Sequence, residues 1–343
     1  MALDARDRLR RLPKAELHVH LDGSLRPATM VQLAQDRGVP LPASDATALA
    51  DAMAVGRAAS LEEYLERFAV TLALMQDRDA LERIGYELAA DHAAEGVRHV
   101  EVRFCPALCT SRGLTSADVL DAVLGGLDRA CDDFDIRARV IVCALRSRSP
   151  SASREMADLA VSYAGHGVCG FDLAGAEAGH PVRDHLDALR VVSRAGLPIT
   201  IHAGEGFGSA SIREAVEMGG ASRIGHGTRL IEDPELLRRV RESGIPLEVC
   251  LTSNVQTGVV RSYAEHPMRD YFDAGIQVSL CTDNRLMSRV TLTREYEHAR
   301  DDLGFSWTEL IRVARAGFEN AFASDEAKAS MLERFDLDVV GLR

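Results

Sequence analysis

Residues 13–27 read P-K-A-E-L-H-V-H-L-D-G-S-L-R-P, and the interpretation of the whole chain starts from this stretch. Its apolar residues alternate with His18 and His20, as in a strand with two different faces. Side chains two positions apart in a strand point to the same side, so both imidazoles would face one point. Two neutral imidazoles at a strand end are a good half-site for Zn²⁺, although a single His-x-His pair is weak evidence, because surface pairs occur by chance.

Seven more apolar or alternating segments follow, separated by segments with helical periodicity. Apolar strands that alternate with helices are typical of a parallel sheet covered on both faces. Eight such strands predict an α/β protein with a closed (β/α)₈ TIM barrel, and an open doubly wound sheet is the alternative. The expected strands are 15–21, 97–104, 138–145, 168–173, 198–202, 223–227, 246–251 and 277–282.

The segment between the first two expected strands, residues 27–95, is helical and too long for one barrel helix. We expect extra helices after strand 1 that form a lid over one rim of a single domain, residues 1–343. Within this segment, Ser60-Leu61-Glu62-Glu63 predicts a capping box at the start of a helix. The chain has no Gly-x-Gly-x-x-Gly after a strand, no P-loop and no linker.

Composition limits the partners. The net charge of −12 argues against nucleic acid or an anionic membrane as the main partner. No apolar run of 18 residues occurs, and Met1–Arg11 lacks the apolar core of a secretory signal, so we expect a cytoplasmic protein. The seven cysteines are scattered without a Cys-x-x-Cys pair, which favours reduced thiols over a disulfide framework.

Polar residues follow several of the expected strands, at the end where such barrels carry their active sites. Three imidazoles and one carboxylate from strands 1, 5 and 8 form a credible zinc set: His18, His20, His202 and Asp283. Glu205 follows His202 closely enough to move protons, and His226 could orient or deprotonate the attacking water. Each residue alone also has an ordinary explanation, such as a helix cap for Asp283, and their shared position favours a site.

Other polar residues receive structural roles. Glu101 and Arg103 are expected to point inward on strand 2 and to form an interior salt bridge or a hydrogen bond to a ligand-bearing loop, in preference to a catalytic role. Strand 4 lacks the lysine that often bridges two metals on this fold, which favours one metal ion. The remaining histidines have no partner at ligand spacing and are interpreted as surface or core residues: His92, His99, His166, His180, His185, His266 and His298.

Six segments together resemble the adenosine deaminase family of the amidohydrolase superfamily, and they span most of the chain in the family's order. These are residues 13–27, E-G-V-R-H-V-E-V-R-F-C-P (95–106), F-D-L-A-G-A-E (171–177), H-A-G-E (202–205), R-I-G-H-G (223–227) and C-T-D-N-R-L-M-S (281–288). The resemblance implies a (β/α)₈ barrel with extra helices after strand 1. It also implies one zinc ion per chain, held by His18, His20, His202 and Asp283.

The resemblance also implies roles around a purine. Glu205 would protonate N1, and His226 would position and deprotonate the zinc-bound water, with Asp283 holding the attacking oxygen. His20 and Asp22 would lie near the substrate, Asp22 beside the ribose, and Gly175 would offer a backbone donor near N3. Asn284 stands where mammalian members carry Asp. Its amide can donate to purine N7 at any pH, whereas a carboxyl group must first be protonated.

The implied reaction is zinc-dependent hydrolytic deamination of adenosine or 2′-deoxyadenosine to inosine, with release of ammonia. The partner would be a small purine nucleoside. The alternatives are deamination of adenine, a modified adenosine or aminodeoxyfutalosine, a non-catalytic ligand-binding relative, and another hydrolase of the superfamily. Adenylate is disfavoured, because Arg67 and Arg78 of the helical segment are not clustered.

Overall fold

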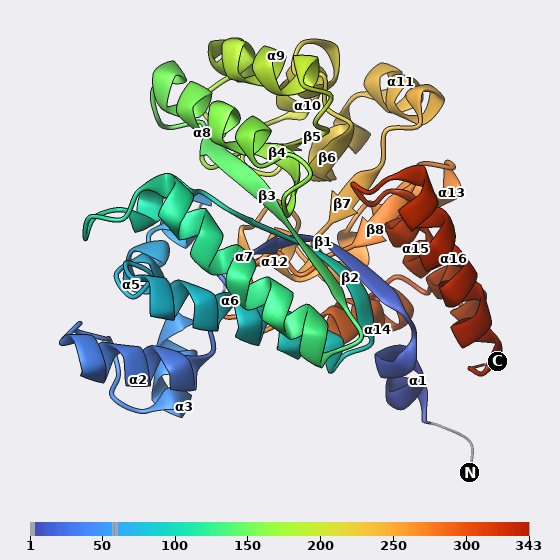
Figure 1. Ribbon diagram of the computed structural model, residues 1–343. Coiled ribbons are helices and arrows are strands. Elements are labelled where there is room, and N and C mark those ends of the chain that lie inside the picture. The colour runs from blue at the N-terminus through green and yellow to red at the C-terminus, as the bar shows by residue number, and fades with distance from the viewer. Residues whose placement is uncertain (1–3, 57, 59–60, 343) are drawn as a thin grey trace.

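Eight parallel strands form the centre of the structure, and they pair in the order in which they occur in the chain. Helices surround them on the outside (Figure 1). The computed structural model describes residues 4–56, 58 and 61–342. The strands are β1 Lys14–His20, β2 Val97–Phe104, β3 Arg137–Leu145, β4 Val168–Ala174, β5 Ile199–Ala203, β6 Arg223–His226, β7 Leu247–Val249 and β8 Val278–Leu280.

Backbone pairing just beyond β8 joins the last strand to the first. The His20 N–H donates to the carbonyl oxygen of Asp283 at 2.7 Å, and the Asp283 N–H donates to that of His18 at 2.8 Å. Val19 and Asp283 form the corresponding parallel bridge. The predicted (β/α)₈ barrel is therefore confirmed, and the open doubly wound sheet is wrong.

The predicted strands agree with the structure to within a few residues, and the largest differences are at β7 and β8. Both are three residues long, shorter than the predicted 246–251 and 277–282. After β7 the chain enters helix α12, Leu251–Gln256, directly after Cys250. After β8 it leaves the ladder and reaches β1 only at Asp283.

The helices between the strands begin and end at ordinary sequence signals. Helix α11, Pro234–Ser243, is an example. Asp233 caps it by accepting the N–H of Leu236 at 3.0 Å, and Gly244 ends it in a left-handed conformation. The other barrel helices are α7 Ser116–Asp133, α8 Pro150–Ser162, α9 Leu186–Arg194, α10 Ser209–Glu217, α13 Met268–Asp273, α14 Leu292–Asp301, α15 Trp307–Glu319 and α16 Asp325–Val340, and α1 Ala5–Arg11 precedes β1.

The helical segment after β1 divides into two parts. Helix α6, Arg78–Ala93, packs against α7 and β2 and is therefore the barrel helix of the first strand–helix unit. The additional helices are α2 Pro27–Arg37, α3 Ala46–Met53, α4 Leu61–Leu65 and α5 Phe68–Leu72. Ser60, the first residue of the predicted capping box, lies outside the described residues.

A layer of charged side chains fills the inside of the barrel. Arg103 is fully buried and donates to Asp172 Oδ2 at 3.0 Å, to Glu248 Oε2 at 2.9 Å and to the Leu17 carbonyl oxygen at 2.5 Å. Arg223 donates to Glu248 Oε1 and to Glu101 Oε2, both at 2.6 Å. The interior salt bridges expected at Glu101 and Arg103 are therefore confirmed, with partners that the sequence did not indicate.

Two further expectations concern covalent and membrane structure. All seven cysteines are free, as predicted. Within the part of the chain that the structure describes, no helix combines the length and the apolar composition that crossing a bilayer requires.

Replacing Arg103 with Met should destabilise the metal-free protein by about 3–5 kcal/mol, because Asp172 and Glu248 would lose a buried cation. Urea unfolding monitored by circular dichroism measures this change. Arg129→Met is the control, because Arg129 pairs with Glu82 at the surface, where such pairs contribute about 0–1 kcal/mol. Equal losses in the two variants would show that the interior layer adds nothing to stability.

Candidate active site

Histidines from strands β1, β5 and β6 and one aspartate just beyond β8 converge at the C-terminal end of the barrel. Nitrogen or oxygen atoms of His18, His202, His226 and Asp283 all lie within 4.8 Å of one another, and all four residues are buried. His20 joins this group, because its Nε2 lies 3.1 Å from Nε2 of His202 and 3.4 Å from Oδ1 of Asp283. The structure thus brings together the four predicted metal ligands and places His226 beside them.

The donor set fits a metal ion. Nε2 of His18 is buried without a hydrogen-bond partner among the described residues, and Asp283 Oδ1 lies 3.5 Å from it. Imidazoles must be neutral to bind a metal, and burial lowers the pKa of His20, His202 and His226. At His18 burial and Arg103 also act to lower the pKa, but the nearby carboxylates of Asp283 and Glu248 outweigh them and raise it. A metal ion would displace a proton there.

Carboxylates of the interior layer orient two of the imidazoles. Glu248 Oε2 lies 2.8 Å from Nδ1 of His18, and Asp172 Oδ2 lies 3.0 Å from Nδ1 of His202. A carboxylate accepts, so in each ring Nδ1 carries the proton and Nε2 faces the centre of the group. The sequence analysis missed both carboxylates, because each lies within an apolar strand far from its histidine in the chain.

Backbone strain is concentrated at this site. His226 has a φ of 62° and Asp283 a φ of 59°, and they are two of the three non-glycine residues with positive φ in the described chain. Such conformations cost about 1–3 kcal/mol each and persist where the surrounding structure imposes them. At Asp283 the two backbone hydrogen bonds to β1 impose the conformation.

The loop that carries Glu205 is held by a second glutamate. The Glu177 carboxylate accepts three consecutive backbone N–H groups, from Gly204 at 3.0 Å, Glu205 at 2.8 Å and Gly206 at 3.0 Å. As a result, Oε2 of Glu205 lies 3.4 Å from Nε2 of His226. Glu177 ends the segment F-D-L-A-G-A-E, but nothing in its sequence context indicated this contact.

A cavity of about 370 Å³ opens above the histidines and is lined by the seven residues predicted for catalysis or substrate binding: His20, Asp22, Gly175, Glu205, His226, Asp283 and Asn284. Its other wall is apolar and includes Leu61, Leu65, Phe68 and Leu72 of α4 and α5. Burial raises the pKa of Asp22 to about 7. The cavity therefore combines an apolar wall with a few converging polar groups, as small-molecule sites do.

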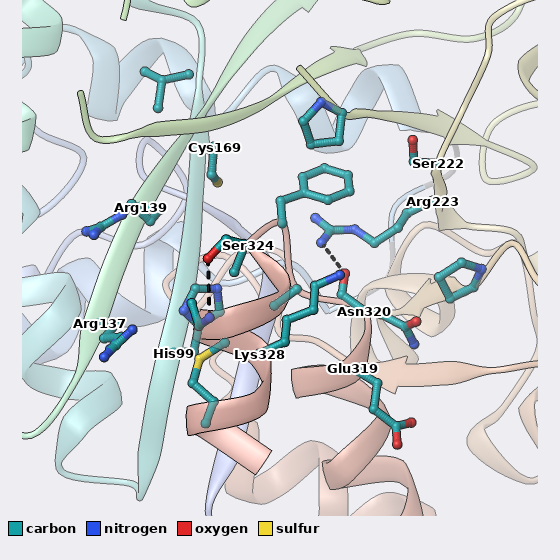
Figure 2. Close-up of a pocket in the computed structure, with 18 of the residues that line it drawn as sticks. His99, Arg137, Arg139, Cys169, Ser222, Arg223, Glu319, Asn320, Ser324 and Lys328 are labelled. Atoms are coloured by element: carbon teal, nitrogen blue, oxygen red, sulfur yellow. Dashed lines mark hydrogen bonds between the residues drawn. The ribbon is translucent and has the colours of Figure 1, made fainter. Parts of the chain in front are cut away.

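A larger cavity of about 720 Å³ lies at the opposite end of the barrel, where the strands begin (Figure 2). It contains none of the predicted site residues. Its basic side chains do not meet at one point, because Arg137 and Arg139 lie on one side of it, whereas Lys328 extends toward the side of Arg223 (Figure 2). The smaller cavity is the candidate active site, since barrel enzymes carry catalytic groups where the strands end.

A family model described as "Adenosine deaminase" matches residues 13–337. The chain belongs to the adenosine deaminase family. A member named adenosine deaminase from Mycobacteroides abscessus is 42% identical over 337 residues, which cover 94% of this chain and 93% of that protein. Family membership and the barrel make the protein a hydrolytic deaminase.

Three solved structures show how the family barrel recurs. An adenine deaminase from Arthrobacter aurescens has a TM-score of 0.88 at 29% identity and covers 95% of this chain and 99% of its own. An amidohydrolase from Burkholderia ambifaria with bound Zn has a TM-score of 0.87 at 29% identity, with coverage of 100% and 96%. Arabidopsis ADAL complexed with IMP has a TM-score of 0.86 at 30% identity, with coverage of 96% and 97%.

Replacing Asp172 with Asn should weaken binding of a divalent transition metal about 10- to 100-fold, because His202 would lose the carboxylate that orients its ring. Titration of metal-free protein with Co²⁺ or Zn²⁺ in competition with a chelator measures the affinity. Asp187→Asn is the matched control, because Asp187 pairs with Arg190 at the surface. Unchanged affinity in Asp172→Asn would mean that the carboxylate of Asp172 does not contribute to metal binding through His202.

Proposed function

We propose that this protein is a zinc-dependent deaminase that hydrolyses adenosine or 2′-deoxyadenosine to the corresponding inosine, with release of ammonia. The observation that carries the proposal is that the Glu205 carboxylate lines the same cavity as three residues that could hold a metal ion, His202, His226 and Asp283. The adenosine deaminase from Mycobacteroides abscessus supports the choice of substrate.

We assign one zinc ion to His18, His20, His202 and Asp283, the set that the family resemblance implies. The amidohydrolase from Burkholderia ambifaria, which was solved with bound Zn, supports this metal. When bound, zinc would act as a Lewis acid that makes water a better nucleophile near neutral pH. His226 also lies within this group of atoms, but we place it beside the reacting water and not among the ligands.

The protein groups around the cavity would hold the purine and move its protons. Glu205 delivers a proton to N1, so that negative charge does not build on the ring when water adds at C6. Asn284 donates to N7, and the Gly175 N–H donates to N3. Asp22 lies at the ribose, where its raised pKa lets the carboxyl group donate or accept a hydrogen bond.

The cavity favours a nucleoside over a nucleotide. Among the described residues that line it there is no arginine or lysine, and Glu66 on its wall would repel a phosphate. Arabidopsis ADAL, by contrast, was solved with IMP. The cavity of the present protein has a volume of about 370 Å³, within the range of about 300–1,000 Å³ that is usual for drug-sized ligand sites. This volume favours a nucleoside over a free base. Adenine is the second candidate, because of the similarity to an adenine deaminase.

We further propose that the whole chain is one catalytic domain and that α4 and α5 are the part of the helical segment 27–95 that forms the lid. Leu61, Leu65, Phe68 and Leu72 of these helices form the apolar wall of the cavity. Closing this wall over a substrate would exclude bulk water and strengthen the polar contacts beneath it.

The proposed function predicts that the metal-loaded protein converts adenosine and 2′-deoxyadenosine faster than adenine or AMP. A panel of these four compounds, followed by the ultraviolet change on deamination and by ammonia release, measures the preference. AMP turned over as fast as adenosine would contradict the nucleoside assignment, and no turnover of any 6-aminopurine would contradict the function.

Glu205→Gln should lower kcat by about 10²- to 10⁴-fold, because the amide cannot deliver a proton to N1. Zinc content should stay near that of the unmodified protein, since Glu205 is not an assigned ligand. Glu232→Gln, at a surface pair with Arg229, is the control. Retained activity would remove Glu205 from the mechanism.

Glu177→Gln should lower kcat about 10- to 100-fold with little change in metal content. One amide oxygen cannot accept all three backbone N–H groups that hold the Glu205 loop, and small misplacements of a catalytic group are costly. Steady-state kinetics with adenosine tests this, with Glu214→Gln at a surface pair with Arg183 as control. An unchanged kcat would show that the loop keeps its geometry without Glu177.

A further inference from the structure

A buried chain of hydrogen bonds leads from helix α13 to His226. The N–H of Met268 lies 3.1 Å from Nδ1 of His266, and Nε2 of His266 lies 3.0 Å from Oδ1 of Asn254. The hydroxyl of Thr228 donates to the same Asn254 oxygen at 2.9 Å. The Asn254 amide nitrogen then lies 3.0 Å from Nδ1 of His226. Asn254 is fully buried, and none of the four side chains is more than 3% exposed.

The direction of every hydrogen bond in this chain follows from its first member. A backbone N–H can only donate, so Nδ1 of His266 is an acceptor and the ring proton is on Nε2. Nε2–H of His266 and the Thr228 hydroxyl both donate to Asn254, which identifies the atom facing them as the amide oxygen. The amide NH₂ of Asn254 therefore faces His226, and an NH₂ group can only donate.

Nδ1 of His226 is consequently an acceptor, and the ring carries its proton on Nε2. This is the reverse of His18 and His202, whose Nδ1 atoms face carboxylates and whose Nε2 atoms are free to bind a metal. Three imidazoles at one site are thus held in two different tautomers by their buried partners. The distances among these residues do not show which of them are ligands. The tautomer does distinguish them, because His226 differs in it from His18 and His202.

We infer that Asn254 is a positioning residue that keeps Nδ1 of His226 as an acceptor and thereby presents Nε2–H to the attacking water. His226 then donates a hydrogen bond to the oxygen of that water and does not take its proton, in contrast to the role that the family resemblance implied. This inference rests on the proposed function, because it assigns a role in the same reaction.

If His226 does not take a proton from water, Glu205 can carry that proton from water to the purine ring. Oε2 of Glu205 lies 3.4 Å from Nε2 of His226, so both groups face the same water. As the bond between water oxygen and C6 forms, one proton passes from water to Glu205 and from Glu205 to N1. The second proton stays on the new hydroxyl until the C6–N6 bond breaks, and it leaves with the nitrogen as ammonia.

The tautomer can be measured without turnover. Metal-free protein labelled with ¹⁵N-histidine distinguishes protonated from unprotonated ring nitrogens by chemical shift, and His226→Gln identifies the signals of His226 by their loss. We expect an unprotonated Nδ1 and a protonated Nε2 in His226 at pH 8. A protonated Nδ1 would overturn the inference.

Asn254→Asp reverses the bond to His226 while it keeps the shape of the side chain. One carboxylate oxygen still accepts from Thr228 and His266, and the other requires a proton on Nδ1 of His226. We expect the ¹⁵N signals of His226 to exchange and kcat for adenosine to fall about 10- to 100-fold. If His226 were the base that deprotonates water, the same change would leave its Nε2 free and more basic, and kcat would be maintained or increase.

Thr228→Val is the matched control, because it removes one donor to the Asn254 oxygen and leaves His266 to fix the direction of the amide. It should keep the tautomer of His226 and most of the activity. Circular dichroism and thermal melting confirm that each variant is folded.

If the wild-type tautomer is as expected but no 6-aminopurine is deaminated, the proposed function fails and the assignment of the tautomer stands. If adenosine is deaminated but Nδ1 of His226 is protonated, the inference fails and the function stands.

Discussion

The charged layer inside the barrel is the interaction on which the rest of the site depends. Arg103 lies between Asp172 and Glu248, and Arg223 holds the other oxygen of Glu248. Burial alone would raise the pKa of both carboxyl groups, but Arg103, with His202 at Asp172 and Arg223 at Glu248, lowers them. The two carboxylates therefore stay ionised in the interior and can fix the rings of His202 and His18 above them. The orientation of two imidazoles that could bind a metal thus depends on side chains one layer below them.

This arrangement explains what the sequence could and could not predict. Strands and barrel helices could be predicted because their signals are local, as at α11, where a cap, a proline and a glycine mark both ends. The convergence of His18, His202 and Asp283 followed from topology, because equivalent strand ends meet at one face of a barrel. Their supporting groups could not be found in this way. Glu248 is 230 residues from His18 in the chain. The sequence around a single acidic residue in an apolar strand does not indicate which residue it contacts.

His266 is a second example of the same limit. It stands alone in the sequence and was interpreted as a surface or core residue, which is correct as a description of its burial. Its importance comes from the direction of its hydrogen bonds, and that direction is set by the backbone N–H of Met268. The extra helices after β1 were expected as a group, but the division into a barrel helix and four additional helices required the packing of α6 against α7 and β2.

Asp283 has two structural roles, since its backbone joins the last strand to the first while its side chain belongs to the group that could hold a metal ion. Binding of a metal ion by this group would therefore be thermodynamically linked to closure of the barrel. A cation that binds only the folded chain adds RT ln(1 + [L]/Kd) to its stability, and here the residues that would hold it include the one that joins the last strand to the first. Metal binding would thus stabilise the folded barrel, in addition to supplying chemistry at the site.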